Sequence, residues 1–390
     1  MPTHLRSSAV FGFLVTAPVS LALLAATLSA FSSLFPSLGV VASSTTTAAR
    51  AAPPPARAAP PPGGPDTAPE PASVTIGWVG DTMLGRAGAL PPDRGRAILA
   101  KTGRVTVAPD LMLGNLEGTL SVGGASKCGV ASANCHAFQV PPNHAGALHR
   151  AGFDLMSMGN NHAYDFGKTG RDQSARALEA AGIASTGGPG EITVLEHHGI
   201  KVAVLGFAPY PWAAPLNDHG AARELVREAR EQADLVVVTM HAGAEGADRT
   251  HTPVGTEVAH GENRGNPRRF ARTVIDAGAD LVLGAGPHVL RGMERYKGRL
   301  IAYSLGNHAG WHNFSGGGTL GLSAILRVTL REDGTFERGI LTPLILQPPG
   351  TPVRDPSHAS TRLVDRLSVQ DFGSSAVRLG QRGRLRWPAS

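Results

Sequence analysis

Several apolar runs of this sequence end in side chains that can bind metal ions or move protons. A carboxylate, an amide or an imidazole stands where each buried strand should stop. These residues are Asp81, Glu117, Asn160, Asn161, His162, His241 and His288. In α/β sheets, ligands bind in the loops beyond the carboxyl ends of the strands. We therefore expect these side chains to meet in one pocket, although they are spread over more than half of the chain.

The chemical types of these side chains indicate which metal ions the pocket would hold. Carboxylate oxygens, an amide oxygen and imidazole nitrogens form a mixed set of ligands that suits Mn²⁺, Zn²⁺ or Fe, whereas Ca²⁺ prefers oxygen alone. Two such ions about 3.5 to 4 Å apart can activate water and stabilise the attacking and leaving oxygens of a phosphoester. We predict Glu117 as the bridging carboxylate, Asp81 as a ligand of one ion and Asn161 as a ligand of the other.

The remaining residues of the set are predicted to complete the metal site or to act on a substrate. His241 and His288 are further metal ligands, and Asn160 is a substrate contact. His162 and Asp81 are the predicted catalytic residues, because an imidazole can protonate a leaving group or orient a phosphoryl oxygen near neutral pH.

Each of these residues also has a plainer explanation. Asp81 and Asn161 could simply cap turns, as Asp and Asn often do after strands. His241 or His288 taken alone is more often a hydrogen-bonded structural histidine. Glu117 is harder to explain in that way, because a carboxylate directly after an apolar strand needs a partner. The joint occurrence of these residues is what favours a metal site.

A glycine-rich loop over residues 251–269 adds polar groups that could face the same pocket. His260 and Arg264 are predicted substrate contacts, with Glu262 beside them, because Arg can bind phosphate or carboxylate through two parallel hydrogen bonds. A solvated surface loop is the alternative. Further along, Tyr303, Ser304 and Asn307 could orient the ligands, although core packing explains Tyr303 equally well.

The periodicity of apolar residues predicts an α/β domain with a mixed sheet or two sheets. The expected strands lie near 74–81, 110–118, 152–162, 234–243, 280–288, 322–330 and 336–346, and the expected helices near 167–182, 221–232 and 267–277. Two hairpins should turn at 198–199 and 297–298. We place one domain at 73–350 and expect residues 351–390 to form a surface segment with a short helix and a loose tail.

The N-terminal part predicts export. Residues 9–31 carry no charge and are about as long as the roughly twenty residues that cross a bilayer as a helix, so residues 1–36 are predicted as a membrane anchor or a signal peptide. Residues 37–72 are rich in Ala, Pro and Thr and cannot bury enough apolar surface to fold, which predicts a disordered linker. The folded domain would then be extracytoplasmic, held at the cell membrane or secreted after cleavage.

The two cysteines of the chain are consistent with a location in an oxidising compartment. Cys128 and Cys135 are the only cysteines of the chain, and a disulfide between them is favoured over free thiols. The net charge of +6 arises from Lys and Arg interspersed with Asp and Glu. No basic run with interleaved aromatic residues occurs, so we do not expect nucleic-acid binding.

Taken as a set, these segments resemble the CapA (PgsA-like) family of capsule and poly-γ-glutamate synthesis proteins, whose domain is similar to calcineurin-like metallophosphoesterases. The matching segments are GDTMLGR, NLEGTLS, GNNHAYDFG, HAGAEG and GPHVLRGMERYKGRLIAYSLGN, which together cover roughly residues 75–330. The resemblance implies a four-layer α/β/β/α sandwich. It also implies Asp81, Glu117, Asn161, His162, His241 and His288 as the inherited positions of the metal site.

The sequence departs from the family pattern at one turn. Family members commonly carry another histidine before the final Pro-His, whereas Ala285 and Gly286 stand here, so one metal position is expected to be weakened or empty. An open wall beside His241 is also expected, because HAG replaces the commoner His-Trp-Gly.

The resemblance implies an envelope protein of capsule or poly-γ-glutamate synthesis with a metal site. Its expected partners are an anionic polymer or phosphoester substrate, the membrane and capsule-synthesis membrane proteins. The alternatives are a secreted metal-dependent phosphoesterase unrelated to capsule and a non-catalytic scaffold whose site has decayed.

Overall fold

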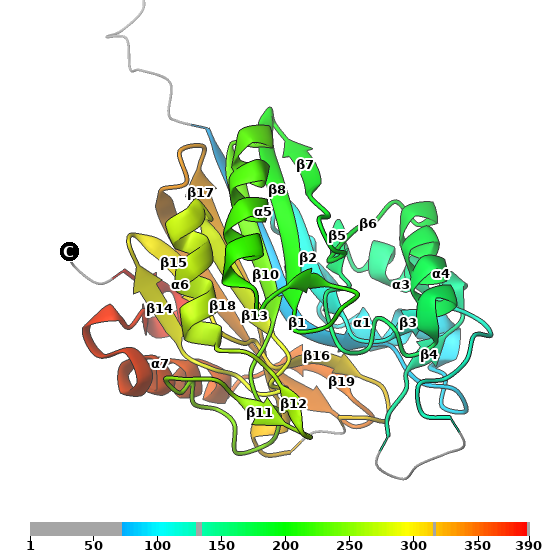
Figure 1. The fold of residues 1–390 in the computed structure, drawn as a ribbon. Coiled ribbons are helices and arrows are strands. Elements are labelled where there is room, and N and C mark those ends of the chain that lie inside the picture. The colour runs from blue at the N-terminus through cyan, green and yellow to red at the C-terminus, as the bar shows by residue number, and fades with distance from the viewer. Residues whose placement is uncertain (1–71, 130–134, 315–316, 388–390) are drawn as a thin grey trace, which may run out of the picture. The chain divides into compact units, whose positions relative to one another are not determined.

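The computed structural model describes residues 72–129, 135–314 and 317–387. Within these residues, the strands form two large sheets and three ribbons of two strands each (Figure 1). The hydrophobic segment and the linker predicted before residue 72 lie outside the described part. Of the helices that are described, none combines the length and the apolar character that crossing a membrane requires.

The first sheet has the strand order β19-β18-β17-β1-β2-β5-β6, and β16 pairs with β1. Its strands are β1 (Ser73–Met83), β2 (Leu111–Leu116), β5 (Leu155–Ser157), β6 (Ala184–Thr186), β16 (Asn307–Gly310), β17 (Leu322–Arg331), β18 (Phe336–Gln347) and β19 (Thr351–Arg354). β1, β2, β5 and β6 run parallel to one another, whereas β17 pairs antiparallel with β1. The carboxyl ends of β1, β2 and β5 therefore share one edge of the sheet.

The second sheet has the order β14-β15-β13-β10-β8-β7, and β9 pairs with β8. Its strands are β7 (Thr193–His197), β8 (Ile200–Ala208), β9 (Ala214–Pro215), β10 (Leu235–His241), β13 (Leu281–Ala285), β14 (Met293–Tyr296) and β15 (Arg299–Ala302). β8, β10 and β13 are parallel, and the two predicted hairpins are the antiparallel pairs β7 with β8 and β14 with β15. The ends of β10 and β13 therefore lie together as well.

One hydrophobic cluster takes side chains from both sheets. Ile76 and Trp78, at alternate positions of β1, pack in the same cluster as Val202 and Val204 of β8. Alternate residues of a strand point to the same face, so β1 buries this face against the second sheet. The indole N–H of Trp78 donates to the carbonyl of Gly284 at 3.1 Å, which joins β1 to β13. The ends of the two sheets are thus held in a defined relation.

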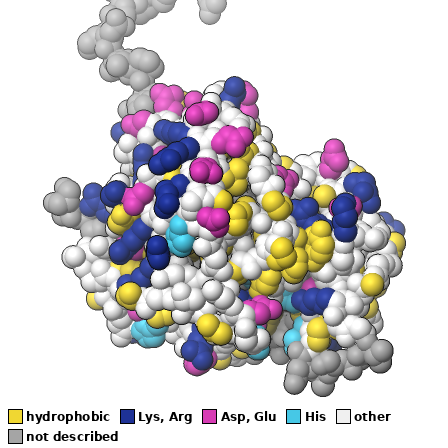
Figure 2. Space-filling view, in the orientation of Figure 1, with side chains coloured by type: hydrophobic (Ala, Val, Ile, Leu, Met, Phe, Trp, Pro, Cys, Tyr) yellow, Lys and Arg dark blue, Asp and Glu magenta, His cyan; other side chains and the backbone are white. Residues whose placement is uncertain are grey.

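Helices cover the remaining faces of the sheets. α5 (His219–Gln232) and α6 (Pro267–Ala277) share a second hydrophobic cluster with β8 and β10, and their charged residues are Arg and Glu on α5 and Arg and Asp on α6 (Figures 1 and 2). α3 (Ala145–Arg150) and α4 (Gly167–Ala180) share a third cluster with β2 and β5. The short elements are α1 (Arg96–Leu99), α2 (Gly103–Thr106), β3 (Thr119–Leu120), β4 (Gln139–Val140), β11 (Val258–Ala259), β12 (Glu262–Asn263), β20 (Arg378–Leu379) and β21 (Leu385–Arg386).

The C-terminal residues differ from the surface segment expected after residue 350. β19 extends the first sheet, and α7 (Ala359–Phe372) buries Leu363, Val364 and Leu367 in the cluster shared by the two sheets. The expectation missed this because the charged and polar residues of α7 interrupt its apolar pattern. The expected strand over 152–162 is also shorter, since only 155–157 pair as β5 and the polar residues that follow form turns.

A buried histidine beside this sheet makes the stability of the fold sensitive to acid. His308 in β16 is fully buried, and neither ring nitrogen has a hydrogen-bond partner among the described residues. Burial lowers the pKa of His308 to about 3. Between that value and the ordinary histidine pKa, the ring of His308 is protonated in the unfolded chain and neutral in the folded chain. The free energy of unfolding therefore falls as the pH drops below the ordinary histidine pKa.

We expect acidification from about pH 7.5 to about pH 5 to cost the wild type about 2 kcal/mol through His308 alone. His308→Leu should remove that part of the pH dependence. Urea unfolding of both proteins at the two pH values measures the difference, with His149→Gln as the exposed histidine control. Equal pH dependence in wild type and His308→Leu would contradict this account.

Candidate metal centre

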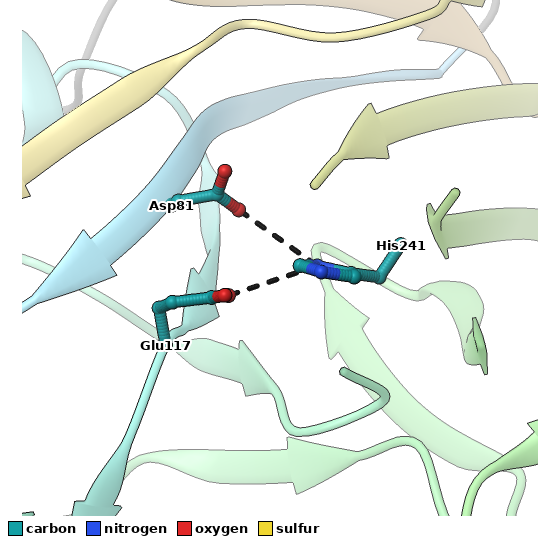
Figure 3. Close-up of side chains that lie close together, drawn as sticks. All are labelled: Asp81, Glu117 and His241. Atoms are coloured by element: carbon teal, nitrogen blue, oxygen red, sulfur yellow. Dashed lines mark ion pairs between the residues drawn. The ribbon is translucent and has the colours of Figure 1, made fainter. Parts of the chain in front are cut away.

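Three side chains from three strand ends meet in a buried cluster. Asp81 lies near the end of β1, Glu117 directly follows β2 and His241 ends β10. One potential ligand atom of each lies within 4.8 Å of the others, and all three residues are buried (Figure 3). The Nδ1 atom of His241 is 3.8 Å from Asp81 Oδ1 and 3.6 Å from Glu117 Oε2. The two sheets therefore supply one joint set of side chains that could hold a metal ion.

Asn115 holds the two carboxylates of this cluster together. Its Nδ2 amide donates to Asp81 Oδ1 at 2.8 Å and to Glu117 Oε2 at 2.6 Å. Its Oδ1 accepts from the side chain of Asn160 at 3.0 Å, which sets the orientation of the amide. The sequence analysis missed Asn115, although it precedes Glu117 by two positions and such residues of a strand face the same side.

The protonation of the cluster follows from burial and from neighbouring charges. Burial alone would raise the pKa of Asp81, but His288 and His241 together lower it below its ordinary value. Burial and the nearby Asp81 raise the pKa of Glu117 well above its usual range. Burial also lowers the pKa of His241 to about 3, so its ring is neutral at pH 7, which is the form that binds metals.

His288 connects the cluster to the turn after β13. Its Nδ1 lies 2.9 Å from Asp81 Oδ2 and 2.9 Å from Asn307 Oδ1. Burial opposes a charge on this ring, yet Asp81 and Glu245 raise the pKa of His288 well above its ordinary value. Gly286 has φ +108° and its N–H donates to Asp81 Oδ2 at 3.2 Å. At this position a backbone N–H, and not a side chain, approaches the cluster.

His162 lies beside Oε1 of Glu117, and the carboxylate of Asp165 holds its ring. Its Nδ1 is 2.8 Å from Asp165 Oδ2, and its Nε2 is 3.7 Å from Glu117 Oε1. Lys127 pairs with the second oxygen of Asp165 at 2.6 Å. Burial lowers the pKa of His162, although Asp165 opposes this shift. Neither Asp165 nor Lys127 was predicted. The spacing of three between His162 and Asp165 within a turn was the available signal.

Unpartnered buried atoms indicate that these residues fit a metal ion. Glu117 Oε1, His241 Nε2 and Asn161 Oδ1 are buried and have no hydrogen-bond partner among the described residues. Leaving such atoms unpaired costs free energy, so each one calls for a physical explanation. A carboxylate oxygen, an imidazole nitrogen and an amide oxygen are all ligands of divalent transition metals. The donor set therefore matches the mixed oxygen and nitrogen set expected from the sequence.

A cavity of about 730 Å³ opens beside the cluster. Cationic or protonatable side chains dominate its lining, and they are Arg86, Lys127, His136, His162, His260, Arg264, His288 and His312. Glu245 and Glu262 are the acidic residues of the lining. The predicted disulfide between Cys128 and Cys135 is formed, and Cys135 also lines the cavity. The cavity thus presents the fixed positive charges of Arg86, Lys127 and Arg264 together with the two carboxylates to whatever enters it.

The loop residues predicted to contact substrate line this cavity. Glu245, which no prediction named, lies 2.7 Å from His260, 3.4 Å from Arg264 and 3.4 Å from His288. Arg264 also pairs with Glu262 at 3.0 Å and is almost fully buried. Arg264 is therefore a fixed part of the wall and is not a mobile surface side chain.

Two predicted residues have other surroundings than expected. In place of a substrate contact, Asn160 is fully buried and its amide donates to Asn115 and to the carbonyl of Leu116. Tyr303 stacks on Phe372 and donates to Glu294 at 2.7 Å, away from the metal cluster. Core packing thus accounts for Tyr303, whereas Asn307 contacts the ring of His288 beside the cluster.

Comparisons with known proteins cover most of the described region. Residues 75–310 match the model of a family described as "Bacterial capsule synthesis protein PGA_cap". The "Capsule biosynthesis protein CapA" of Bacillus anthracis is 28% identical over 257 residues, which cover 59% of this chain. The "PGA biosynthesis protein CapA" of Bacillus subtilis is 27% identical over 284 residues, which cover 67% of this chain and 69% of that protein.

These similarities have limits in length and in structure. The chain spans 57% of the length of the Bacillus anthracis protein. Among solved structures, a 5'-nucleotidase precursor from Thermus thermophilus has a TM-score of 0.42 at 16% identity, over 77% of this chain and 59% of that one.

Proposed function

The chain belongs to the bacterial capsule synthesis family PGA_cap, and from this membership we propose that it takes part in making a capsule or poly-γ-glutamate polymer at the cell envelope. The names of the two Bacillus relatives support this proposal. Within that process, the proposed task of this domain is to bind and hydrolyse an anionic substrate at a metal site. A phosphoester and the anionic polymer itself are the two candidate substrates.

The buried oxygen and nitrogen atoms that lack a hydrogen-bond partner among the described residues support this proposal most strongly. Asp81, Glu117 and His241 would hold a divalent ion, with Asn161 and His288 as further ligands. Mn²⁺, Zn²⁺ and Fe suit this mixed donor set. We propose Glu117 as the shared ligand if two ions bind. The second position would be the weaker one, because Gly286 brings no side chain to it.

The residues around the ion have distinct proposed roles. When bound, a divalent ion supplies Lewis-acid polarisation of a phosphoryl oxygen and a more acidic water. Protonated His162 would donate a proton from Nε2 to the leaving group, because Asp165 accepts from Nδ1 and leaves Nε2 free to face the substrate. Asn115 keeps Asp81 and Glu117 at a fixed separation. Lys127 and Arg264 would attract the negative charge of the substrate.

The architecture and the cellular placement complete the proposal. We propose a four-layer α/β/β/α arrangement for the domain at 73–350, supported by one hydrophobic cluster shared by the sheets and one on each outer face. Residues 1–36 would anchor the protein in the membrane or direct its secretion, with 37–72 as the linker. The disulfide supports an extracytoplasmic location. Capsule-synthesis membrane proteins would be the partners.

Metal analysis of the purified full chain tests the proposal directly. We expect one or two equivalents of Mn or Zn per chain, and hydrolysis of a phosphodiester or of polyglutamate that disappears in Asp81→Ala. Metal binding without any hydrolysis would favour the scaffold over the enzyme. Phosphodiesterase activity without any effect on polymer would favour the secreted phosphoesterase. Absence of metal binding would contradict the proposed site.

A further inference from the structure

A buried ion pair lies behind the wall of the cavity. Arg291 is fully buried, and its guanidinium donates to both carboxylate oxygens of Glu257, at 2.7 and 2.8 Å. Such two-point pairs fix direction as well as distance. Neither residue lines the cavity or touches the metal cluster among the described contacts. Arg291 and Glu257 can therefore affect the cavity only through the residues to which they are hydrogen-bonded.

The Arg291–Glu257 pair holds the backbone of two segments beside the cavity, residues 243–245 and 257–265. The carboxylate of Glu257 accepts from the N–H of Ala244 at 3.0 Å, and Arg291 donates to the carbonyl of Ala244 at 3.1 Å. Backbone hydrogen bonds of 2.9 Å join Gly243 N–H to Arg264 and Arg264 N–H to Glu257. Residues 243–245 and 257–265 are thereby fastened to each other and to the strand connection that carries Arg291.

These two segments carry the charged groups of the wall. Glu245 is adjacent to Ala244 and lies 3.4 Å from both Arg264 and His288. The pair also explains a glycine of the HAGAEG motif. Gly243 has φ +97°, and a Cβ there would lie 2.7 Å from Arg291 Nη1 and 3.1 Å from Glu257 Oε1. The motif therefore combines a metal ligand, a glycine that leaves space for the ion pair and a cavity carboxylate.

We propose that Arg291 and Glu257 are positioning residues that hold Glu245 and Arg264 where the anionic part of a substrate binds. The substrate role of Arg264 rests on the function proposed above, whereas the fastening of the loop does not. Without the pair, the four hydrogen bonds among Arg291, Glu257 and Ala244 are lost at once, and Arg264 is no longer directed into the cavity. Asp81, Glu117 and His241 keep their contacts with one another and with Asn115, so metal binding and anion binding should separate.

Hydrogen exchange of the full chain tests only whether the Arg291–Glu257 pair holds residues 243–245 and 257–265 together. The amides of Gly243, Ala244 and Arg264 are expected to exchange roughly tenfold faster or more in Glu257→Gln than in the wild type. Gly243→Ala should act in the same direction. Arg291→Lys should give a smaller effect, because lysine keeps the charge but cannot form two parallel bonds. Wild-type exchange at these amides in Glu257→Gln would overturn the proposal.

Calorimetry then tests the role toward anions, with inorganic phosphate as the probe for the Mn²⁺-loaded protein. We expect the phosphate Kd of Glu257→Gln to rise roughly tenfold while its Mn²⁺ Kd stays within about twofold. Glu294→Gln is the matched control, because Glu294 is also buried and paired with an arginine, Arg272, at 2.5 Å. It should change neither Kd.

The outcomes of the two experiments are distinguishable. Equal loss of phosphate and Mn²⁺ affinity in Glu257→Gln and Glu294→Gln would mean general loosening of the fold and would overturn the positioning role. If the wild type binds no phosphate, the proposed function of Arg264 fails. Faster exchange in Glu257→Gln would in that case still support the fastening of the loop.

Discussion

Replacing Glu117 with glutamine is expected to abolish the stabilisation of the protein by Mn²⁺ or Zn²⁺ while leaving the metal-free protein at least as stable as the wild type. Burial and the neighbouring Asp81 raise the pKa of Glu117 well above its usual range, so its charge is costly in the metal-free fold. Glutamine removes that charge, and its carbonyl can still accept from Asn115. Glutamine at this position, however, has no negative charge to bind a metal ion.

Thermal or urea unfolding with and without metal measures both effects. A metal ion at about a hundred times its Kd should stabilise the wild type by about 2.7 kcal/mol and Glu117→Gln by almost nothing. Glu262→Gln is the control, because Glu262 lines the cavity without belonging to the cluster. Equal metal stabilisation of Glu117→Gln and the wild type would rule out Glu117 as a ligand.

Replacing His162 with asparagine is expected to slow hydrolysis selectively for substrates with poor leaving groups. Loss of a general acid typically costs about 10²- to 10⁴-fold in rate. A nitrophenolate leaves without a proton, so bis-nitrophenyl phosphate should be affected far less than an alkyl phosphodiester. Metal stabilisation should be unchanged, because His162 approaches Oε1 of Glu117 and does not belong to the cluster of Asp81, Glu117 and His241.

The pH dependence of the wild type gives an independent check on His162. Burial lowers the pKa of His162 below its ordinary value of 6.5, so the protonated ring is lost as the pH rises through that lowered value. Hydrolysis of the alkyl phosphodiester should therefore decline toward neutral pH relative to the nitrophenyl substrate. Asp165→Asn should give an intermediate rate, since the ring remains but its orientation is less restricted. Equal losses for both substrates would argue against proton donation by His162.

The pattern of apolar runs was sufficient to predict the strands and helices that carry the site. The helix expected at 267–277 has those bounds in α6, and both hairpin turns are formed where they were expected. Glu117 and His241 could be identified because a polar group at the end of a buried strand stands out against its neighbours. Asp81 and Glu117 meet because β1 and β2 are parallel and share an edge of the first sheet, whereas His241 reaches them from the second sheet through the packing of the two sheets.

The contacts that complete the site could not be predicted in the same way. Asn115 lies inside an apolar strand, Glu257 in the glycine-rich loop and Arg291 between β13 and β14, and no sequence period marks any of them. A short helix was expected in the C-terminal segment, but the burial of α7 was not, because its packing depends on a partner surface far away in the chain.

The sequence by itself determined the class of fold, the chemical types of the candidate metal ligands and the family, because these depend on local periodicity and on short motifs. Only the tertiary structure decided which side chains hold the ligands in place, such as Asn115 between two carboxylates and Arg291 behind the cavity loop. The physical reason is that a buried polar group must find its partner in space, and that partner can come from any part of the chain.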